Sequence, residues 1–223
     1  MNNNYVIAIT RTCGSGATSI SRILGERLGI NVYDRNLLRL ASDDSGINEE
    51  LFARADEHMK QSLLYRISKK VYNGEIIPPD SNDFTSNDNL FNYQAKVLKE
   101  LAANESFICI GRAADYILKD NPNLITIFIC APMDKCIKRE MELLSFDAKK
   151  AEQHIITTDK YRAGFYKYHT GREWKNPENY DLCLNTGKFD YETCVDIIEN
   201  YIKTRLAGAK ERLFTMLKEE FHG

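Results

Sequence analysis

The chain has 223 residues and carries 30 basic against 32 acidic side chains, which gives a formal net charge of −2. A chain of this length is typical of one domain, and it can bury roughly 70% of its unfolded surface without a disulfide or a metal. The near-neutral charge argues against a nucleic-acid-binding protein, and the 43% share of hydrophobic residues argues against a disordered one. We therefore expect a single domain over residues 1–223, with no nucleic acid as partner.

The cysteines and the apolar runs indicate where such a protein works. Six cysteines are present, and no two of them have the CxxC spacing of a zinc or redox motif. The first residues lack the basic and apolar segments of a signal peptide, and the most apolar stretch, Leu124–Ala131, is too short to span a membrane. The sequence predicts free thiols, a cytoplasmic location and no membrane partner.

The first third of the chain begins with an apolar run, Tyr5–Thr10, that is typical of a buried strand. Two glycines follow in a loop, and then Ile20, Ile23, Leu24 and Leu28 recur at the spacing of one helix face. A second short strand, Ile30–Tyr33, ends at Asp34. Further helices are predicted at 48–72 and 90–103, separated by a polar loop over 74–89.

The rest of the chain continues to alternate strands with helices. Strands are predicted at 106–110, 124–130 and 180–185, and helices at 113–119, 133–144, 148–168 and from about 191 onward. Strands that are apolar throughout are typical of a parallel sheet buried on both faces. The fold class is therefore α/β, a parallel sheet flanked by helices, with helical insertions at about 35–104 and 132–170 placed where such sheets bind ligands.

The loop after the first strand is the strongest local signal for function. A strand, a glycine-containing turn and a helix direct backbone N–H groups and the positive helix end toward an anion. Against the phosphate-loop pattern G-x-x-x-x-G-K-[ST], Gly16 and Thr18 match. Arg11 stands in place of the first glycine and Ala17 in place of the lysine. Because Arg11 lies at the carboxyl end of the strand, it can supply the positive charge that Ala17 cannot.

Two other interpretations of this loop stay open. The segment from Gly14 to Ser19 is close to the dinucleotide-binding pattern, and Asp34 lies near the place of its ribose-binding acid. A chain without the lysine could also bind a nucleotide and transfer nothing. Cys13 lies near a helix N-terminus, which would lower its pKa, or it is a small loop residue. His154 is expected to be an ordinary helix-face histidine, without metal ligands at helical spacing.

The order of the later motifs resembles that of nucleoside monophosphate kinases, most closely the divergent cytidylate kinase-like group whose phosphate loop lacks the lysine. Ile30–Asp34 is similar to the strand that opens the monophosphate pocket. Gly111-Arg112 resembles the Gly-Arg-Asp motif, with Ala113 in place of the aspartate. Asp159 and Arg162 are similar to the Asp-x-x-Arg pattern of the lid.

This resemblance implies ATP as phosphoryl donor, Mg²⁺ as cofactor and a nucleoside monophosphate such as CMP or dCMP as acceptor. Positive groups around the transferring phosphoryl are what this chemistry needs. The expected catalytic residues are Arg11, Arg139 and Arg162, and Thr18 is the expected Mg²⁺ ligand. The donor is expected to bind Cys13, Gly14, Ser15, Gly16, Ala17, Thr18 and Ser19, and the acceptor Asp34, Arg35, Arg112 and Asp159. The long helices also favour a homodimer.

Overall fold

The computed structural model describes residues 4–52, 75–77, 79, 81, 83 and 85–220, with the side chains of the last helix described up to residue 207. Its centre is a parallel sheet of five strands in the order β2-β3-β1-β4-β5. The strands are β1 (Val6–Arg11), β2 (Asn31–Tyr33), β3 (Phe107–Ile110), β4 (Leu124–Cys130) and β5 (Leu182–Asn185). The predicted α/β class with a parallel sheet is confirmed.

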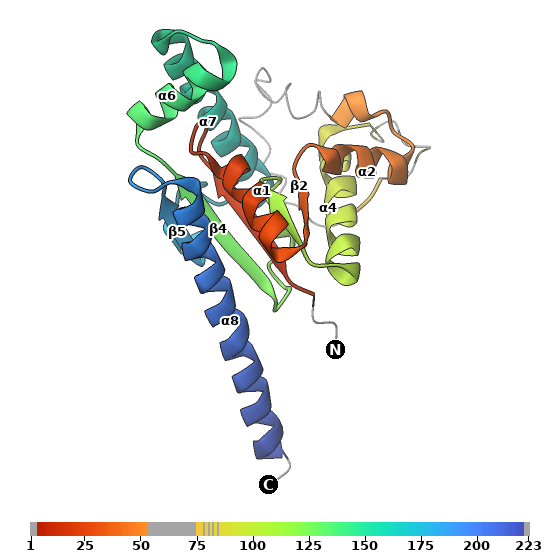
Figure 1. Cartoon of the computed structure of the whole chain (residues 1–223). Coiled ribbons are helices and arrows are strands. Elements are labelled where there is room, and N and C mark those ends of the chain that lie inside the picture. The colour runs from red at the N-terminus through yellow and green to blue at the C-terminus, as the bar shows by residue number, and fades with distance from the viewer. Residues whose placement is uncertain are drawn as a thin grey trace.

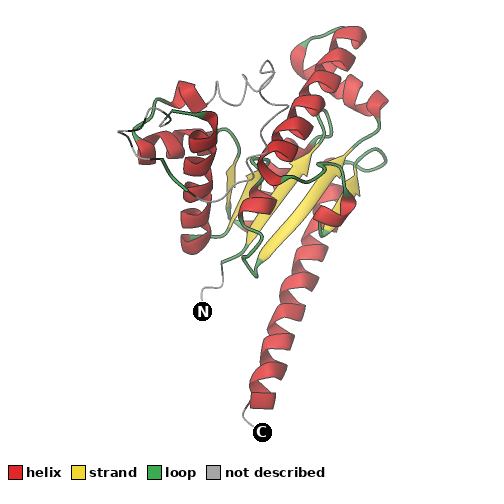
Figure 2. Ribbon diagram, turned by 180° about the vertical axis from the view of Figure 1, so that it is seen from behind, coloured by secondary structure: helices red, strands yellow, loops and turns green. Residues whose placement is uncertain are grey.

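Both faces of this sheet are buried, as the uninterrupted apolar strands predict. On β1, Val6 and Ala8 face one core, and Ile7 and Ile9 face the other. Figure 2 shows the strands between two groups of helices. Because side chains alternate along a strand, a strand between two helical layers needs apolar residues at every position.

The helices are distributed over the two faces as follows. One core packs α1 and α8 against the sheet, and the other packs α4, α5 and the end of α7 (Figure 1). The helices are α1 (Ala17–Leu28), α2 (Asn36–Ser45), α4 (Asn87–Asn104), α5 (Ala114–Ile117), α6 (Met133–Leu144), α7 (Ala148–Thr170) and α8 (Tyr191–Glu220), with a 3-10 turn, η2, at Pro177–Asn179.

The largest differences from the predicted helices lie in the proposed insertion at 35–104. Helix α2 was not predicted, because its polar residues conceal the three buried positions Leu37, Leu38 and Ala41. Helix α4 begins three residues before the predicted Leu90, where the Ser86 hydroxyl accepts a hydrogen bond from the amide of Asn89. Of the helix predicted over 48–72, residues 49–52 are helical and the remainder lies outside the described residues.

The strand order bears on the dinucleotide alternative. A dinucleotide-binding fold places its second strand beside the first, in the order 3-2-1-4-5-6. Here β3 lies between β2 and β1, which does not match that order. The topology therefore speaks against dinucleotide binding.

Helix α8 starts beside β5, and its later turns project well beyond the sheet (Figure 1). The homodimer expected from the long helices stays a prediction. Over the residues that the structure describes, no helix has the length and apolar character needed to cross a membrane.

Candidate functional site

The loop between β1 and α1 is held tightly between two other helices. Gly14 has a φ of +70° and Gly16 a φ of +82°, a left-handed backbone that favours glycine. A Cβ atom on Gly14 would lie 2.8 Å from the backbone of Cys136 in α6. On Gly16 it would lie 2.6 Å from the ring of Tyr191, at the start of α8. Both glycines are therefore required by conformation and by space.

Hydrogen bonds fix the start of this loop. The Thr12 amide donates to Ile129 O at 3.0 Å, and the Ser15 hydroxyl donates to Thr12 O at 2.8 Å. The Cys13 amide donates to the Asp159 carboxylate of α7 at 2.8 Å. The loop is thus bonded to the sheet, to itself and to a distant helix before any ligand binds.

The backbone N–H groups in the first turn of α1 face the cavity. Gly16 precedes the helix and supplies no side-chain cap, so the first N–H groups are left for an anion. Thr18 and Ser19 are exposed and line the cavity, whereas Ala17 is buried in the core. An exposed hydroxyl at a helix N-terminus that faces a cavity fits Mg²⁺, which takes oxygen ligands and keeps several waters.

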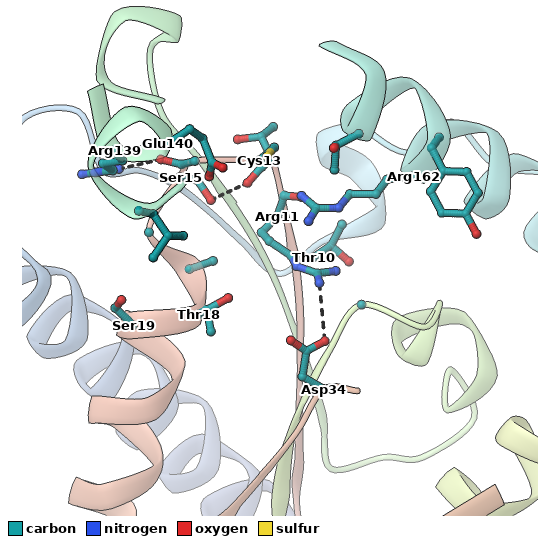
Figure 3. A pocket seen from close by; sticks show the side chains of 18 of the residues that line it. Thr10, Arg11, Cys13, Ser15, Thr18, Ser19, Asp34, Arg139, Glu140 and Arg162 are labelled. Carbon is teal, nitrogen blue, oxygen red and sulfur yellow. Dashed lines mark hydrogen bonds and ion pairs between the residues drawn. The ribbon is translucent and has the colours of Figure 1, made fainter. Parts of the chain in front are cut away.

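Arg11 lies at the end of β1, as the sequence predicts. Its side chain is 18% exposed, and its Nη2 atom lies 3.6 Å from Oδ1 of Asp34 (Figure 3). Burial lowers the pKa of Arg11 to about 10, with a further decrease from Arg162 and Arg112 that Asp34 opposes. Arg11 is therefore protonated at neutral pH and forms part of a concentrated positive region.

The loop after β3, which begins at Gly111, leaves room for the Arg11 side chain. Gly111 has a φ of +78°, and a Cβ atom there would lie 2.3 Å from Nη1 of Arg11. The next two residues also have positive φ values, 61° for Arg112 and 52° for Ala113. Strain of this kind is common at ligand sites, and Arg112 lines the same cavity as Arg11.

Helix α7 brings two predicted residues to the phosphate loop. Arg162 Nη1 donates to the carbonyl oxygen of Arg11 at 3.2 Å, and it lies 3.7 Å from Oδ1 of Asp159. Burial raises the pKa of Asp159, while the Cys13 amide and Arg162 oppose that rise. These contacts couple α7 to the loop at both Arg11 and Cys13.

Arg139 reaches the loop from α6. Its Nη1 atom donates to Gly14 O at 3.2 Å and to the Thr186 hydroxyl at 3.0 Å, and that hydroxyl donates to Ser15 O at 2.8 Å. Arg139 therefore holds loop carbonyls in position, and its predicted catalytic role stays a prediction.

A cavity of about 850 Å³ lies above the loop, within the size range of small-molecule sites. Every residue proposed from the sequence lines it, apart from Asp159, which contacts the loop through the Cys13 amide. The proposed residues in its wall are Arg11, Cys13, Gly14, Ser15, Gly16, Ala17, Thr18, Ser19, Asp34, Arg35, Arg112, Arg139 and Arg162.

Two features of this cavity were missed or misjudged from the sequence. The pKa of Cys13 is raised to about 12, by burial first and then by Glu140, so of the two alternatives for this residue the lowering of its pKa by a helix N-terminus is wrong. Glu140 and His154 also line the cavity, although no motif marked them. The sequence around Glu140 and His154 does not indicate a site, because each of them contacts residues of other elements.

Comparisons of the sequence agree with this geometry. Residues 6–188 match the model of the cytidylate kinase-like family. The chain is 22% identical to a cytidylate kinase of Fervidobacterium nodosum, covering 89% of this chain and 96% of that one. It is 24% identical to a cytidylate kinase of Methanobrevibacter smithii, with 89% and 98% covered. A 28% match to a uronate isomerase of Corynebacterium glutamicum spans only 46% of this chain and 20% of that protein.

Solved structures show the same fold. An uncharacterized protein of Eubacterium ventriosum superposes with a TM-score of 0.66 at 28% identity, covering 90% of this chain and 99% of that one. A shikimate kinase of Bacteroides thetaiotaomicron superposes with a TM-score of 0.50 at 15% identity, covering 89% and 98%. The sheet, the phosphate loop and the match over most of the sequence lead to one conclusion: the chain belongs to the cytidylate kinase-like family.

Proposed function

We propose that this protein transfers the γ-phosphoryl group of ATP to a nucleoside monophosphate, with CMP or dCMP as the first candidates. The observation that carries the proposal is the convergence of the phosphate loop, five arginines and Asp34 on one cavity. Phosphoryl transfer requires positioning and charge stabilisation more than covalent chemistry, and this cavity offers both. The two cytidylate kinases among its relatives support the choice of acceptor.

On the donor side, the free N–H groups at the start of α1 would bind the phosphate oxygens of ATP. Gly14 and Gly16 allow the backbone to approach those oxygens closely. Thr18 would hold Mg²⁺ through its hydroxyl, and the ion would neutralise charge on the phosphates. The preformed hydrogen bonds of Thr12, Cys13 and Ser15 keep the loop in shape, so little order has to be gained on binding.

Arg11 would supply the positive charge that the lysine of the phosphate-loop pattern supplies, since Ala17 stands in the lysine position. Its guanidinium lies at the end of β1, between Asp34 and the Gly111 loop, where it has limited freedom. Arg162 would complete the positive wall from α7, part of the proposed lid at 132–170. A planar guanidinium can bind two phosphate oxygens at once, so arginine suits the developing charge.

On the acceptor side, Arg112 and Arg35 would bind the phosphate of the monophosphate. Both line the cavity beside Asp34, and Arg35 is exposed at the start of α2. The phosphate oxygen of the acceptor is already a nucleophile, so no strong general base is needed. The proposed insertion at 35–104 would form the pocket for the base.

A steady-state assay with ATP and Mg²⁺ tests the proposal. We expect transfer to CMP or dCMP, measured as the corresponding diphosphate, to exceed transfer to AMP and UMP. Binding of ATP, seen as a rise in Tm, with no diphosphate from any acceptor would contradict phosphotransfer and favour the binding-only alternative.

The role of Arg11 has its own test. Arg11→Ala should lower kcat by about 10²–10³, the usual cost of removing one charge-stabilising donor. The matched control is Arg27→Ala, because Arg27 lies on the outside of α1 and pairs with Glu192 and Asp196 of α8. If Arg11→Ala keeps full activity, the replacement of the lysine by Arg11 is wrong.

A further inference from the structure

A second group of side chains lies on the side of the phosphate loop that faces α6 and α7. Cys13 comes from the loop, Glu140 from α6 and His154 from α7. One ligand atom from each, a sulfur, an oxygen and a nitrogen, lies within 4.8 Å of the other two. Glu140 and His154 belong to no sequence motif, and Cys13 occupies a variable position of the phosphate loop, yet the fold brings the three together at one wall of the cavity.

The spacing of these atoms suits a tetrahedral metal ion. Zinc binds sulfur at about 2.3 Å and nitrogen or oxygen at about 2.0–2.2 Å, which separates its ligand atoms by about 3.3–3.8 Å. Nε2 of His154 lies 3.7 Å from Oε2 of Glu140, beyond hydrogen-bond distance and at the separation that a shared ion requires. The remaining pairs of ligand atoms lie within 4.8 Å, so they would draw closer together on binding the ion.

We propose that Cys13, Glu140 and His154 form a binding site for a zinc-type divalent cation, with a fourth position open to the cavity. A thiolate and an imidazole are ligands that zinc accepts readily and magnesium does not. Three protein ligands with one open position are typical of zinc sites that exchange water or an anion.

The neighbourhood of the three residues holds them in place. Cys13 and Glu140 are 6% and 7% exposed, so neither side chain is free to turn into solvent. The Cys13 amide is fixed by Asp159, and the ring of His154 packs edge-on against Phe146 with centroids 5.7 Å apart. Preorganised ligands lose little conformational freedom when the ion binds.

The proposed site differs from the Mg²⁺ position at Thr18. Figure 3 shows Cys13 beside Glu140, whereas Thr18 lies apart from them on α1. On binding, the Cys13 thiol would release its proton to solvent and become the thiolate ligand. The ion would join the phosphate loop to α6 and α7, so it would fix their relative positions.

Cobalt substitution tests the site without reference to phosphotransfer. We expect the metal-free full chain to bind one Co²⁺ and to show a thiolate-to-cobalt charge-transfer band together with the intense visible bands of a tetrahedral complex. Cys13→Ser should abolish the charge-transfer band. Cys183→Ser, which removes an exposed thiol on β5, should leave the spectrum unchanged. A spectrum without the thiolate band, or one that depends on Cys183, would overturn the proposal.

Zinc affinity, measured by competition with a chromophoric chelator, is the second readout. His154→Gln and Glu140→Gln should each weaken Zn²⁺ binding by at least about tenfold, while Glu152→Gln, an exposed carboxylate on the same helix as His154, should not. Thermal unfolding of the metal-free proteins shows whether each variant is folded. If folded His154→Gln binds Zn²⁺ as tightly as the wild type, the site is wrong, whether or not the protein is a kinase.

Discussion

The two halves of helix α7 differ in what surrounds them. In the first half, His154 is 40% exposed in its side chain and stands near Glu140 at the cavity. In the second half, His169 is 2% exposed, and its ring stacks on Phe91 with centroids 3.8 Å apart. The same residue type thus lies in a polar, open site at one end and in the apolar core at the other. Helix α7 therefore presents a partly exposed histidine to the cavity at one end, while its other end is packed in the core.

The middle of α7 joins the two halves to the phosphate loop. Asp159 accepts from the Cys13 amide, and Arg162 donates to the carbonyl oxygen of Arg11. Four residues further on, the Tyr166 hydroxyl donates to the buried Asp115 carboxylate at 2.6 Å. We therefore expect changes in the middle to affect activity most, changes in the buried half to affect stability, and changes in the open half to affect neither strongly in the absence of metal.

Among the residues of α7, the largest effect is expected at Arg162. Arg162→Met removes a positive group from the cavity and frees the Arg11 carbonyl, so kcat for phosphotransfer should fall by about 10² or more. Initial rates at saturating ATP and acceptor measure this. Arg172→Met is the matched control, because Arg172 lies just beyond α7 over the ring of Tyr116 and away from the loop. Equal rates for the two variants would contradict a role of Arg162 in phosphotransfer.

A smaller effect is expected when Arg11 is displaced indirectly. Gly111→Ala places a methyl group in contact with the Arg11 guanidinium and should lower kcat by about tenfold, the equivalent of about 1.4 kcal/mol. The left-handed backbone should also reduce the free energy of unfolding by about 1–2 kcal/mol.

Gly29→Ala separates these two causes. Gly29 has a φ of +65° but no atom within 4 Å of the added Cβ. It should show the same loss of stability in urea unfolding with unchanged kcat. A comparable loss of kcat in Gly29→Ala would mean that destabilisation, and not the position of Arg11, explains the result.

The buried half of α7 should make stability depend on pH. Burial lowers the pKa of His169 to about 3, against about 6.5 in the unfolded chain. The unfolded state therefore binds more protons below pH 6.5, and stability falls as the pH decreases from 6.5 toward 3. Between pH 7 and pH 5 the His169 contribution should decrease by about 2 kcal/mol, measured by urea unfolding. His169→Gln should lack this part of the decrease; if it retains the full decrease, His169 is not the group responsible.

The open half should respond least. His154→Gln in the metal-free protein should change the free energy of unfolding by no more than about 0.5 kcal/mol at pH 7, as is usual for a surface position. If His154→Gln loses more stability than His169→Gln, the description of the first half of α7 as open and the second half as buried is wrong.

Much of the site could be predicted because its parts lie near strand ends. The carboxyl ends of parallel strands meet at one edge of the sheet, so Arg11, Asp34 and Arg112 were expected to be neighbours. The contact between Arg11 and Gly111 could not be predicted, since it depends on the path of one side chain. The same holds for Arg139, whose bonds to Gly14 and Thr186 join three separate elements.

The sequence by itself determined the strands, most of the helices and the type of sheet, because apolar periodicity reports local burial and the glycine positions report turns. It also determined the phosphate loop and its missing lysine, which are contiguous in the chain. Only the tertiary structure decided that Cys13 meets Glu140 and His154, and that one histidine of α7 is buried while the other is open. Such contacts depend on how α6 and α7 pack against the loop, and packing between distant segments leaves no periodic trace in the sequence.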